Sequence, residues 1–139
     1  MQRILGSLAP LFFELPVNDQ RHGIDVLETV TRLDGHPDVL LQQAALLHDL
    51  GKGVANFSIV ERSLTVFLRA VSRRTLDALL RSRPAFARRY GIYADHAKIG
   101  AERLRAAGAA DLAAIVAEHH ATHPQSEVTR HLQRADGRN

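Results

Sequence analysis

The chain of 139 residues contains no cysteine and no tryptophan, and aromatic residues make up only 5% of it. The absence of cysteine excludes disulfides and thiolate metal sites, so a bound metal must take nitrogen and oxygen ligands. Long hydrophobic runs are also missing, because no stretch approaches the ~20 apolar residues that a membrane-spanning helix needs. We therefore expect a soluble, cytoplasmic protein without a membrane partner.

Signals for β-strands are missing as well, since no run alternates β-branched or aromatic residues with polar ones. Internal repeats, low-complexity tracts and flexible linkers are absent. Hydrophobic residues make up 45% of the chain, which is enough to form the core of one domain of this length. We predict an all-α fold with a single compact domain over residues 1–139. The expected helices are 2–14, 18–33, 37–50, 58–82 with a possible break near Ser72, 84–90, 95–107, 109–121 and 126–136.

The most informative feature that is present is the adjacent pair His48-Asp49, which follows an apolar stretch and precedes Gly51-Lys52. Such a doublet at the end of an apolar helix is typical of a metal-binding corner. Further candidate ligands are His22, His96, His119, His120 and Asp136. Together these residues offer five imidazoles and two carboxylates, which is enough for two metal ions.

Helix lengths predict that these candidates meet. A helix from His22 to Leu33 descends eleven residues, and a helix that opens at Pro37 climbs eleven residues to His48. At a rise of 1.5 Å per residue the two helices are equally long. If they pack as an antiparallel pair, His22 and His48 therefore lie at the same end. The segments on either side of Gly108 follow the same pattern. A helix that begins at His96 ends before Gly108, and a second helix runs back to His119, so His96 and His119 also lie at one end. We therefore predict two antiparallel helix pairs with a metal site at their shared ends.

The ordered series His, His-Asp-x-Gly-Lys, His, His-His, Asp resembles the HD-domain superfamily of metal-dependent phosphohydrolases, over most of the chain. The resemblance implies a helical HD-domain bundle with two divalent transition-metal ions, and nitrogen and oxygen ligands suit Mn, Fe, Co, Ni and Zn alike. It implies that one ion is held by His22, His48, Asp49 and Asp136. It implies that the second is held by His96, His119, His120 and the same Asp49, which acts as a bridge.

The implied activity is hydrolysis of a phosphomonoester or phosphodiester, with a nucleotide as the favoured substrate. Two ions around a bridging carboxylate would produce a metal-activated hydroxide near neutral pH, so Asp49 is a catalytic candidate. Lys52 is the second, because it is placed to hold a non-bridging phosphoryl oxygen. The alternative for Lys52 is an ordinary lysine at a helix end. His123 is a candidate contact to a substrate phosphate, although we expect it to face solvent with His36 and His131.

A basic helical insert, at about residues 58–90, separates the two predicted helix pairs. Between Arg62 and Arg89 lie eight arginines and one acidic residue, Asp77. An arginine-rich wall beside a metal site attracts small anionic substrates. The candidates for substrate binding are Arg73, Arg74, Arg88 and Arg89. The alternative is a solvated arginine face on an amphipathic helix.

Two other functions use the same residues. A di-iron oxygenase of the HD type would bind its metals through the same ligands. A non-catalytic signalling or nucleic-acid-binding HD module would keep the metals for stability and use the arginines as its working surface; nucleic acid is possible but not favoured as a partner. Hydrolysis of cyclic di-GMP is less expected, because the Gly-Tyr-Pro signature of that branch is missing. Asn18 also stands where that branch can carry a glutamate for a third metal. The oligomeric state is left open.

Overall fold

The structure, a computed structural model, describes residues 1–55 and 58–139. Within these ranges every regular element is helical, so the predicted all-α fold is confirmed. The elements are α1 (Gln2–Leu5), η1 (Gly6–Leu8), α2 (Ala9–Phe13), α3 (Val17–Asp34), α4 (Val39–Leu47), η2 (Lys52–Ala55), α5 (Ile59–Val71), α6 (Arg73–Ser82), α7 (Pro84–Ala94), α8 (His96–Ala106), α9 (Ala110–Glu118) and α10 (Glu127–Asp136).

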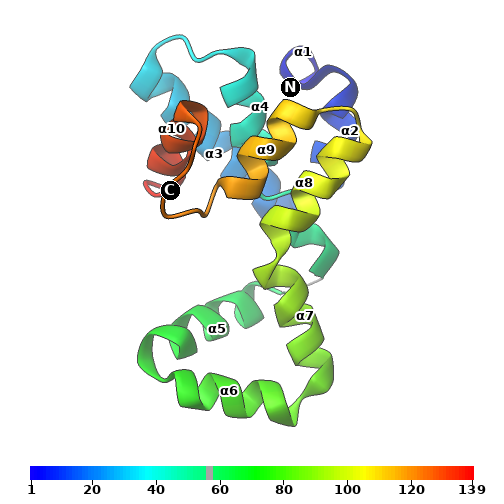
Figure 1. Cartoon of the computed structure of the whole chain (residues 1–139), viewed down its shortest axis with the longest axis vertical. Helices are drawn as coiled ribbons and strands as arrows, with labels where there is room; N and C mark the ends of the chain where they lie inside the picture. The colour runs from blue at the N-terminus through cyan, green and yellow to red at the C-terminus, as the bar shows by residue number, and fades with distance from the viewer. Residues whose placement is uncertain (56–57) are drawn as a thin grey trace.

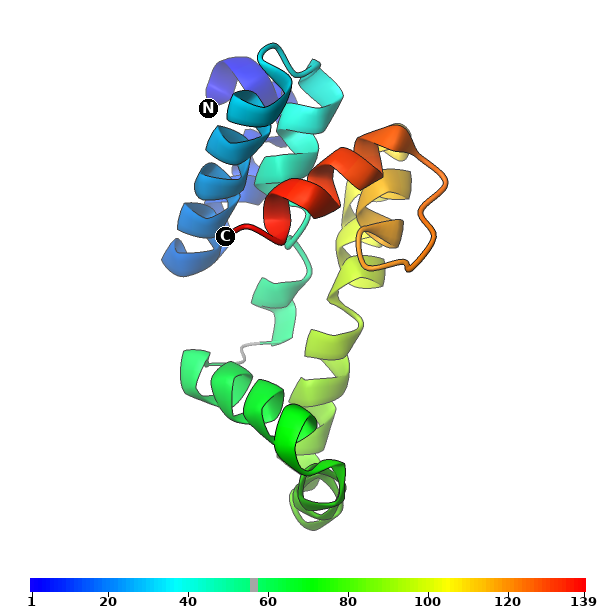
Figure 2. The same ribbon diagram turned by 90° about the vertical axis from the view of Figure 1, so that its left-hand side faces the viewer.

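Figure 1 shows a helical bundle that holds both termini and a lobe, formed by α5, α6 and α7, that extends from it. The bundle is built on the two predicted helix pairs, α3 with α4 and α8 with α9. Helix α10 contacts α3, α4 and α9 and so bridges the two pairs (Figure 2). The lobe contains the predicted basic insert. None of the helices within the described ranges combines the length and apolar character needed to cross a membrane.

The bundle has one hydrophobic core, because each helix pair turns an apolar stripe inward. Its fully buried side chains include Val30 of α3, Leu46 and Leu47 of α4, Leu104 of α8 and Val116 of α9. Burying one such side chain contributes about 1.5–3 kcal/mol to folding. This core holds the two helix pairs against each other and so fixes the relative positions of their ends.

Several predicted helix boundaries are wrong for identifiable local reasons. The expected helix 2–14 is broken at Gly6, whose φ of 53° interrupts the helix after one turn. The expected helix from Pro37 begins at Val39 instead, because the Asp38 carboxylate caps it by accepting a hydrogen bond from the Leu41 amide. The predicted break at Ser72 is confirmed: its backbone is extended and its side chain caps α6. The short helix expected at 84–90 continues to residue 94.

The most consequential difference lies at the ends of α4 and α9. The sequence predicted helices to residues 50 and 121, whereas these helices end at Leu47 and Glu118. The pairs His48-Asp49 and His119-His120 therefore lie in turns. Two adjacent residues in an α-helix point about 100° apart, but in a turn both can face the same place.

Glu118 explains how α10 returns to the bundle after the loop that follows α9. Its carboxylate accepts hydrogen bonds from the amides of Gln125 (2.9 Å) and Ser126 (3.2 Å) and from Thr129 Oγ1 (2.8 Å). Ser126 in turn caps α10 by accepting a hydrogen bond from the Val128 amide. One side chain thus holds both the loop and the first turn of α10.

We predict that Glu118→Ala lowers the free energy of unfolding by about 1–3 kcal/mol, because it removes hydrogen bonds to a charged acceptor. Urea unfolding followed by circular dichroism measures this change. Glu102→Ala, at an exposed position of α8, is the matched control and should change stability by about 0.5 kcal/mol or less. Equal effects of the two substitutions would show that Glu118 does not hold the loop.

Candidate metal centre

Three buried histidines, His48, His96 and His119, share one local geometry. Each lies within two residues of the end of a helix, and its Nδ1 is near the carbonyl oxygen three residues earlier. These distances are 3.0 Å to Ala45, 2.8 Å to Tyr93 and 2.7 Å to Val116. A carbonyl only accepts hydrogen bonds, so Nδ1 must carry the proton and donate it. The Nε2 atom of each ring is then left with a lone pair, as metal binding by imidazole requires.

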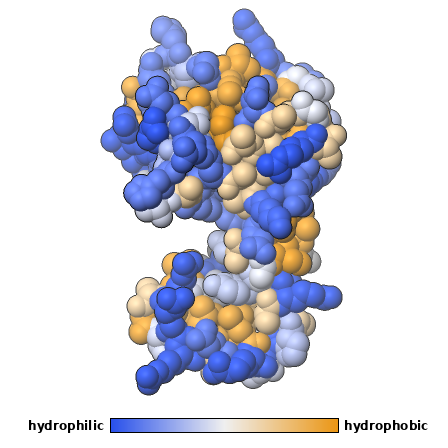
Figure 3. All heavy atoms as spheres, viewed as in Figure 1, coloured by the Kyte–Doolittle hydropathy of each residue, from blue (hydrophilic) through white to orange (hydrophobic). Residues whose placement is uncertain are grey.

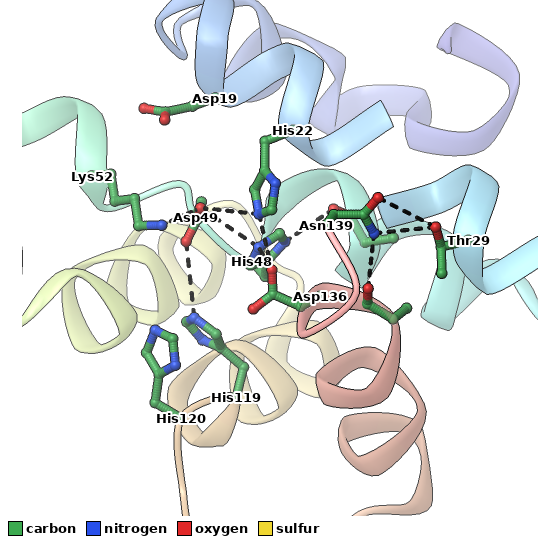
Figure 4. A network of polar contacts seen from close by, with 12 residues as sticks. Asp19, His22, Thr29, His48, Asp49, Lys52, His119, His120, Asp136 and Asn139 are labelled. Atoms are coloured by element: carbon green, nitrogen blue, oxygen red, sulfur yellow. Dashed lines mark hydrogen bonds and ion pairs between the residues drawn. The ribbon is translucent and has the colours of Figure 1, made fainter. Parts of the chain in front are cut away.

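The candidate ligand atoms form two groups, and Figure 4 labels all of their residues except His96. The first group is His22, His48 and Asp136; the second is His96, His119 and His120. Within each group the atoms lie within 4.8 Å of one another. In the first, Asp136 Oδ1 lies 2.9 Å from His22 Nε2 and 3.5 Å from His48 Nε2. In the second, the Nε2 atoms of His96 and His120 are 3.1 Å apart.

Asp49 lies between the two groups and presents one carboxylate oxygen to each. Its Oδ2 is 3.8 Å from His22 Nε2 and 3.6 Å from His48 Nε2. Its Oδ1 is 3.4 Å from His96 Nε2 and 4.0 Å from His119 Nε2. The structure therefore brings together all seven side chains that the sequence singled out as ligands, with the predicted bridge in the middle.

Atoms without partners show that this donor set fits a metal. Among the described residues, His48 Nε2, Asp49 Oδ1 and His119 Nε2 are buried and have no hydrogen-bond partner. An unpaired buried polar atom costs about 1–3 kcal/mol. Cations held by the two groups would accept lone pairs from these atoms. The negative ends of the helix dipoles of α4, α9 and α10 lie at this place as well and favour positive charge.

The pKa values of four histidines of the centre are shifted, three of them downward and that of His48 upward. Burial lowers the pKa of His119 to about 3, and burial also lowers the pKa of His96 and of His120. These three imidazoles are therefore neutral at pH 7 and able to bind a cation. Burial opposes protonation of His48 too, but the charges of Asp49 and Asp136 outweigh it and raise its pKa.

Both carboxylates of the centre remain ionised. Burial alone would raise their pKa values. For Asp49 the charges of His48 and Lys52 outweigh burial, and for Asp136 the hydrogen bond with His22 and the charges of His48 and His22 do so, which holds both pKa values well below the usual range. The Lys52 ammonium forms an ion pair with Asp49 Oδ2. The structure thus places Lys52 on the bridging carboxylate, and its contact with a substrate oxygen stays a prediction.

Arg62 connects the lobe to the centre, which the sequence analysis missed. Its guanidinium binds both carboxylate oxygens of the buried Asp19, at 2.5 and 2.9 Å. Asp19 lies one turn before His22 on α3. Arg62 also lies over the ring of Tyr93, 5.5 Å from its centroid, and that ring stacks on His96. Asp19 was the available signal in the sequence. It lies three residues before His22, and positions i and i+3 share one face of a helix, so Asp19 lies on the side of α3 that faces the centre.

Other predicted site residues lie apart from these seven side chains. Arg73 and Arg74 are exposed in the first turn of α6, at the far side of the lobe in Figure 1. Arg88 is exposed on α7, and Arg89 forms an ion pair with Glu61. His123 is exposed in the loop after α9, as is His36 in the loop after α3, whereas His131 is half-buried and lies 2.9 Å from Asp34. Substrate contacts by these arginines and by His123 stay predictions.

Gly51 permits the close approach of the two helix pairs at the centre. A Cβ atom at this position would lie 2.0 Å from the carbonyl oxygen of His96, which is an impossible contact. A Cβ atom on Gly100, one turn further along α8, would lie 3.1 Å from the Gly51 amide nitrogen. The start of α8 therefore packs directly on the turn that carries Asp49, and any side chain at Gly51 must displace His96.

We predict that Gly51→Ala destabilises the fold by about 1–3 kcal/mol or more, as overpacking does, and weakens divalent-metal binding because His96 moves. Thermal unfolding and calorimetric metal titration measure the two effects. Gly91→Ala is the control, since a Cβ atom there meets nothing within 4 Å on the exposed side of α7. It should leave metal affinity unchanged and stabilise the helix by about 0.5–1 kcal/mol. Unchanged metal affinity in Gly51→Ala would contradict this account.

Comparison with protein-family models matches residues 20–138 to the HD domain. Searches of curated proteins and of solved structures returned no match. The matched segment includes all seven side chains of the centre and spans most of the chain. The chain therefore belongs to the HD-domain family, whose members are generally metal-dependent phosphohydrolases.

Proposed function

We propose that this protein hydrolyses a phosphomonoester or phosphodiester with the help of two divalent metal ions, and that its substrate is a nucleotide. The observation that carries this proposal is the position of Asp49, whose two oxygens face two separate ligand groups. A carboxylate between two histidine-rich groups is the arrangement that a dinuclear hydrolytic centre needs.

The ligands of one ion would be His22, His48, Asp136 and Asp49, and those of the other His96, His119, His120 and Asp49. Bound there, the ions would lower the pKa of a water molecule and take up charge on the phosphoryl oxygens. The protein supplies imidazoles, which carry no negative charge, and only two carboxylates. Two divalent ions carry four positive charges, so two remain after Asp49 and Asp136 are subtracted. This excess favours an anionic substrate.

The cationic side chains around the centre support the same substrate class. Lys52 is held at the centre by Asp49, and Arg62 is held beside it by Asp19. Exposed arginines on α6 and α7, such as Arg73, Arg74 and Arg88, extend the positive potential over the lobe. We propose that this potential steers anionic substrates toward the metals, an effect that salt screens over about 8–10 Å.

Hydrolysis of bis-nitrophenyl phosphate and of a panel of nucleotides, with Mn²⁺ supplied, tests the proposal. We expect nitrophenol or phosphate release by the wild-type protein and none by Asp49→Ala, because that variant lacks the carboxylate between the two groups. Failure of the metal-loaded protein to cleave any phosphate ester would overturn the proposal. Iron-dependent oxygen uptake by the same preparation would then identify it as an oxygenase.

We predict that Lys52→Ala retains its metals but lowers kcat by about 10²-fold, the order expected when one electrostatic contact to a transition state is lost. Lys98→Ala, which removes the only other lysine from an exposed position on α8, should be as active as the wild type. Elemental analysis measures the metal content of each variant beside the kinetic assay. It separates a contact of Lys52 with the substrate from a role in positioning Asp49. Loss of metal from Lys52→Ala would show that Lys52 only maintains the position of Asp49.

A further inference from the structure

The lobe meets the bundle across a narrow waist, which Figure 3 shows on one face of the molecule. On one side of this waist α7 runs into α8, with Asp95 between the two helices. On the other side the first turn of α5 lies beneath the start of α3 (Figure 2). Each side of the waist therefore lies next to a helix that carries a candidate metal ligand, His96 on α8 and His22 on α3.

Arg62 joins α5 to α3 at this waist. Its guanidinium donates two hydrogen bonds to the buried Asp19 carboxylate, at 2.5 and 2.9 Å. Two parallel bonds of this kind fix the plane of a guanidinium as well as its position. Asp19 precedes His22 by about one turn on α3. The Arg62 guanidinium is therefore held at a defined place relative to the first ligand group.

Tyr93 continues the connection toward the second ligand group. The Arg62 guanidinium lies 5.5 Å from the centroid of the Tyr93 ring. That ring stacks on His96, with centroids 5.9 Å apart and an interplanar angle of 30°, and the Tyr93 carbonyl oxygen is 2.8 Å from His96 Nδ1. Tyr93 also packs against Phe86 in the small hydrophobic cluster of the lobe. A continuous series of contacts thus runs from Asp19 on one helix pair, through the lobe, to His96 on the other.

The relative position of the two ligand groups matters because Asp49 must reach both. Its oxygens lie 3.8 Å from His22 Nε2 and 3.4 Å from His96 Nε2. A small displacement of α8 from α3 would therefore separate one group from the bridging carboxylate. Arg62 lies within electrostatic reach of this carboxylate as well. Its hydrogen bonds with Asp19 outweigh burial and raise the pKa of Arg62, and the charge of Asp49 acts in the same direction.

We propose that Arg62 is a positioning residue of the metal centre: through Tyr93 it sets the place of His96 relative to α3, and so permits the second ion to bind. This inference rests on the proposed dinuclear centre and extends it, because it makes the lobe a part of that centre. A lysine could not replace the arginine, since lysine lacks the planar fork that binds a carboxylate with two bonds.

Position and charge predict opposite effects for the loss of this arginine. Arg62→Met removes a positive charge beside the centre and leaves the Asp19 carboxylate, which would tighten the binding of a cation if charge decided. If position decides, the binding becomes weaker. The double variant Asp19→Asn/Arg62→Met removes both charges and leaves no buried carboxylate without a partner. In that variant only the loss of position remains.

Calorimetric titration of the metal-free protein with Mn²⁺ measures the affinity of each ion. We expect two ions in the wild type, and a second ion bound about 10–100-fold more weakly by Arg62→Met and by the double variant, as when a group that orients a metal ligand is removed. His96→Ala identifies this ion, because it removes one of its ligands. The matched control is Arg81→Met, since Arg81 is exposed on α6 at the far side of the lobe in Figure 1. It should leave both affinities unchanged.

Rescue by conservative variants separates positioning from an effect on folding alone. Tyr93→Phe keeps an aromatic ring on His96 and should bind both ions like the wild type. Tyr93→Leu should lose affinity for the second ion, and Arg62→Lys should lose it as Arg62→Met does. Circular dichroism at the temperature of the titration shows that each variant is folded. Lower thermal stability with unchanged affinity of the folded variants would overturn the positioning role.

Other results would overturn the proposal in distinguishable ways. Tighter binding of the second ion by Arg62→Met would show that Arg62 acts through its charge. Unchanged metal binding with a raised KM for phosphate esters would make Arg62 a substrate contact instead. Equal affinities of Tyr93→Leu and the wild type would break the connection to His96. A wild-type protein that takes up only one ion would overturn the proposed function together with this inference.

Discussion

The structure depends on the compensation of one buried charge, the Asp49 carboxylate. A buried carboxylate costs several kcal/mol unless opposite charge and hydrogen bonds surround it. Here the Lys52 ammonium reaches one of its oxygens, while the other has no partner within the described part of the chain and faces His96 and His119. The unpartnered oxygen and the imidazoles that face it are suited to further positive charge, which metal ions would supply.

The rest of the fold places ligands around that carboxylate. The two helix pairs end at the same end of the bundle. These ends pack closely because Gly51 has no side chain that would collide with the backbone of His96. Helix α10 brings Asp136 to the centre through the loop that Glu118 holds. Beyond Asp136, the side-chain amide of Asn139 donates hydrogen bonds to Thr29 Oγ1 and to the Ala135 carbonyl. These bonds fix this end of α10 on α3.

The ligands could be predicted because their positions follow from local rules. Helix lengths decide which histidines lie at the same end of the bundle, together with the breaks at Gly35, which ends α3 with a positive φ, and at Gly108. The break at Ser72 follows from the preference of serine for helix N-caps. The turns after α4 and α9 could not be predicted, since apolar periodicity does not show where the last hydrogen-bonded turn stops. The pairing of Arg62 with Asp19 also escaped prediction, because it joins segments 43 residues apart.

Helix α5 shows the limit of pattern reasoning most clearly. Periodicity identified an amphipathic helix, and the usual interpretation places its apolar side inside and its arginines in solvent. In the structure apolar side chains such as Val60 and Phe67 are exposed together with Arg69. Glu61 and Arg62 instead turn toward the protein and pair with Arg89 and Asp19. A sequence pattern shows that a helix has two sides, but tertiary contacts decide which of them faces the protein.

The most direct test of the account is the metal stoichiometry of the purified protein. Elemental analysis after equilibration with Mn²⁺, followed by desalting, measures ions per chain. We expect close to two ions per chain in the wild type. A protein that never holds more than one ion under these conditions would show that Asp49 does not join two metal sites.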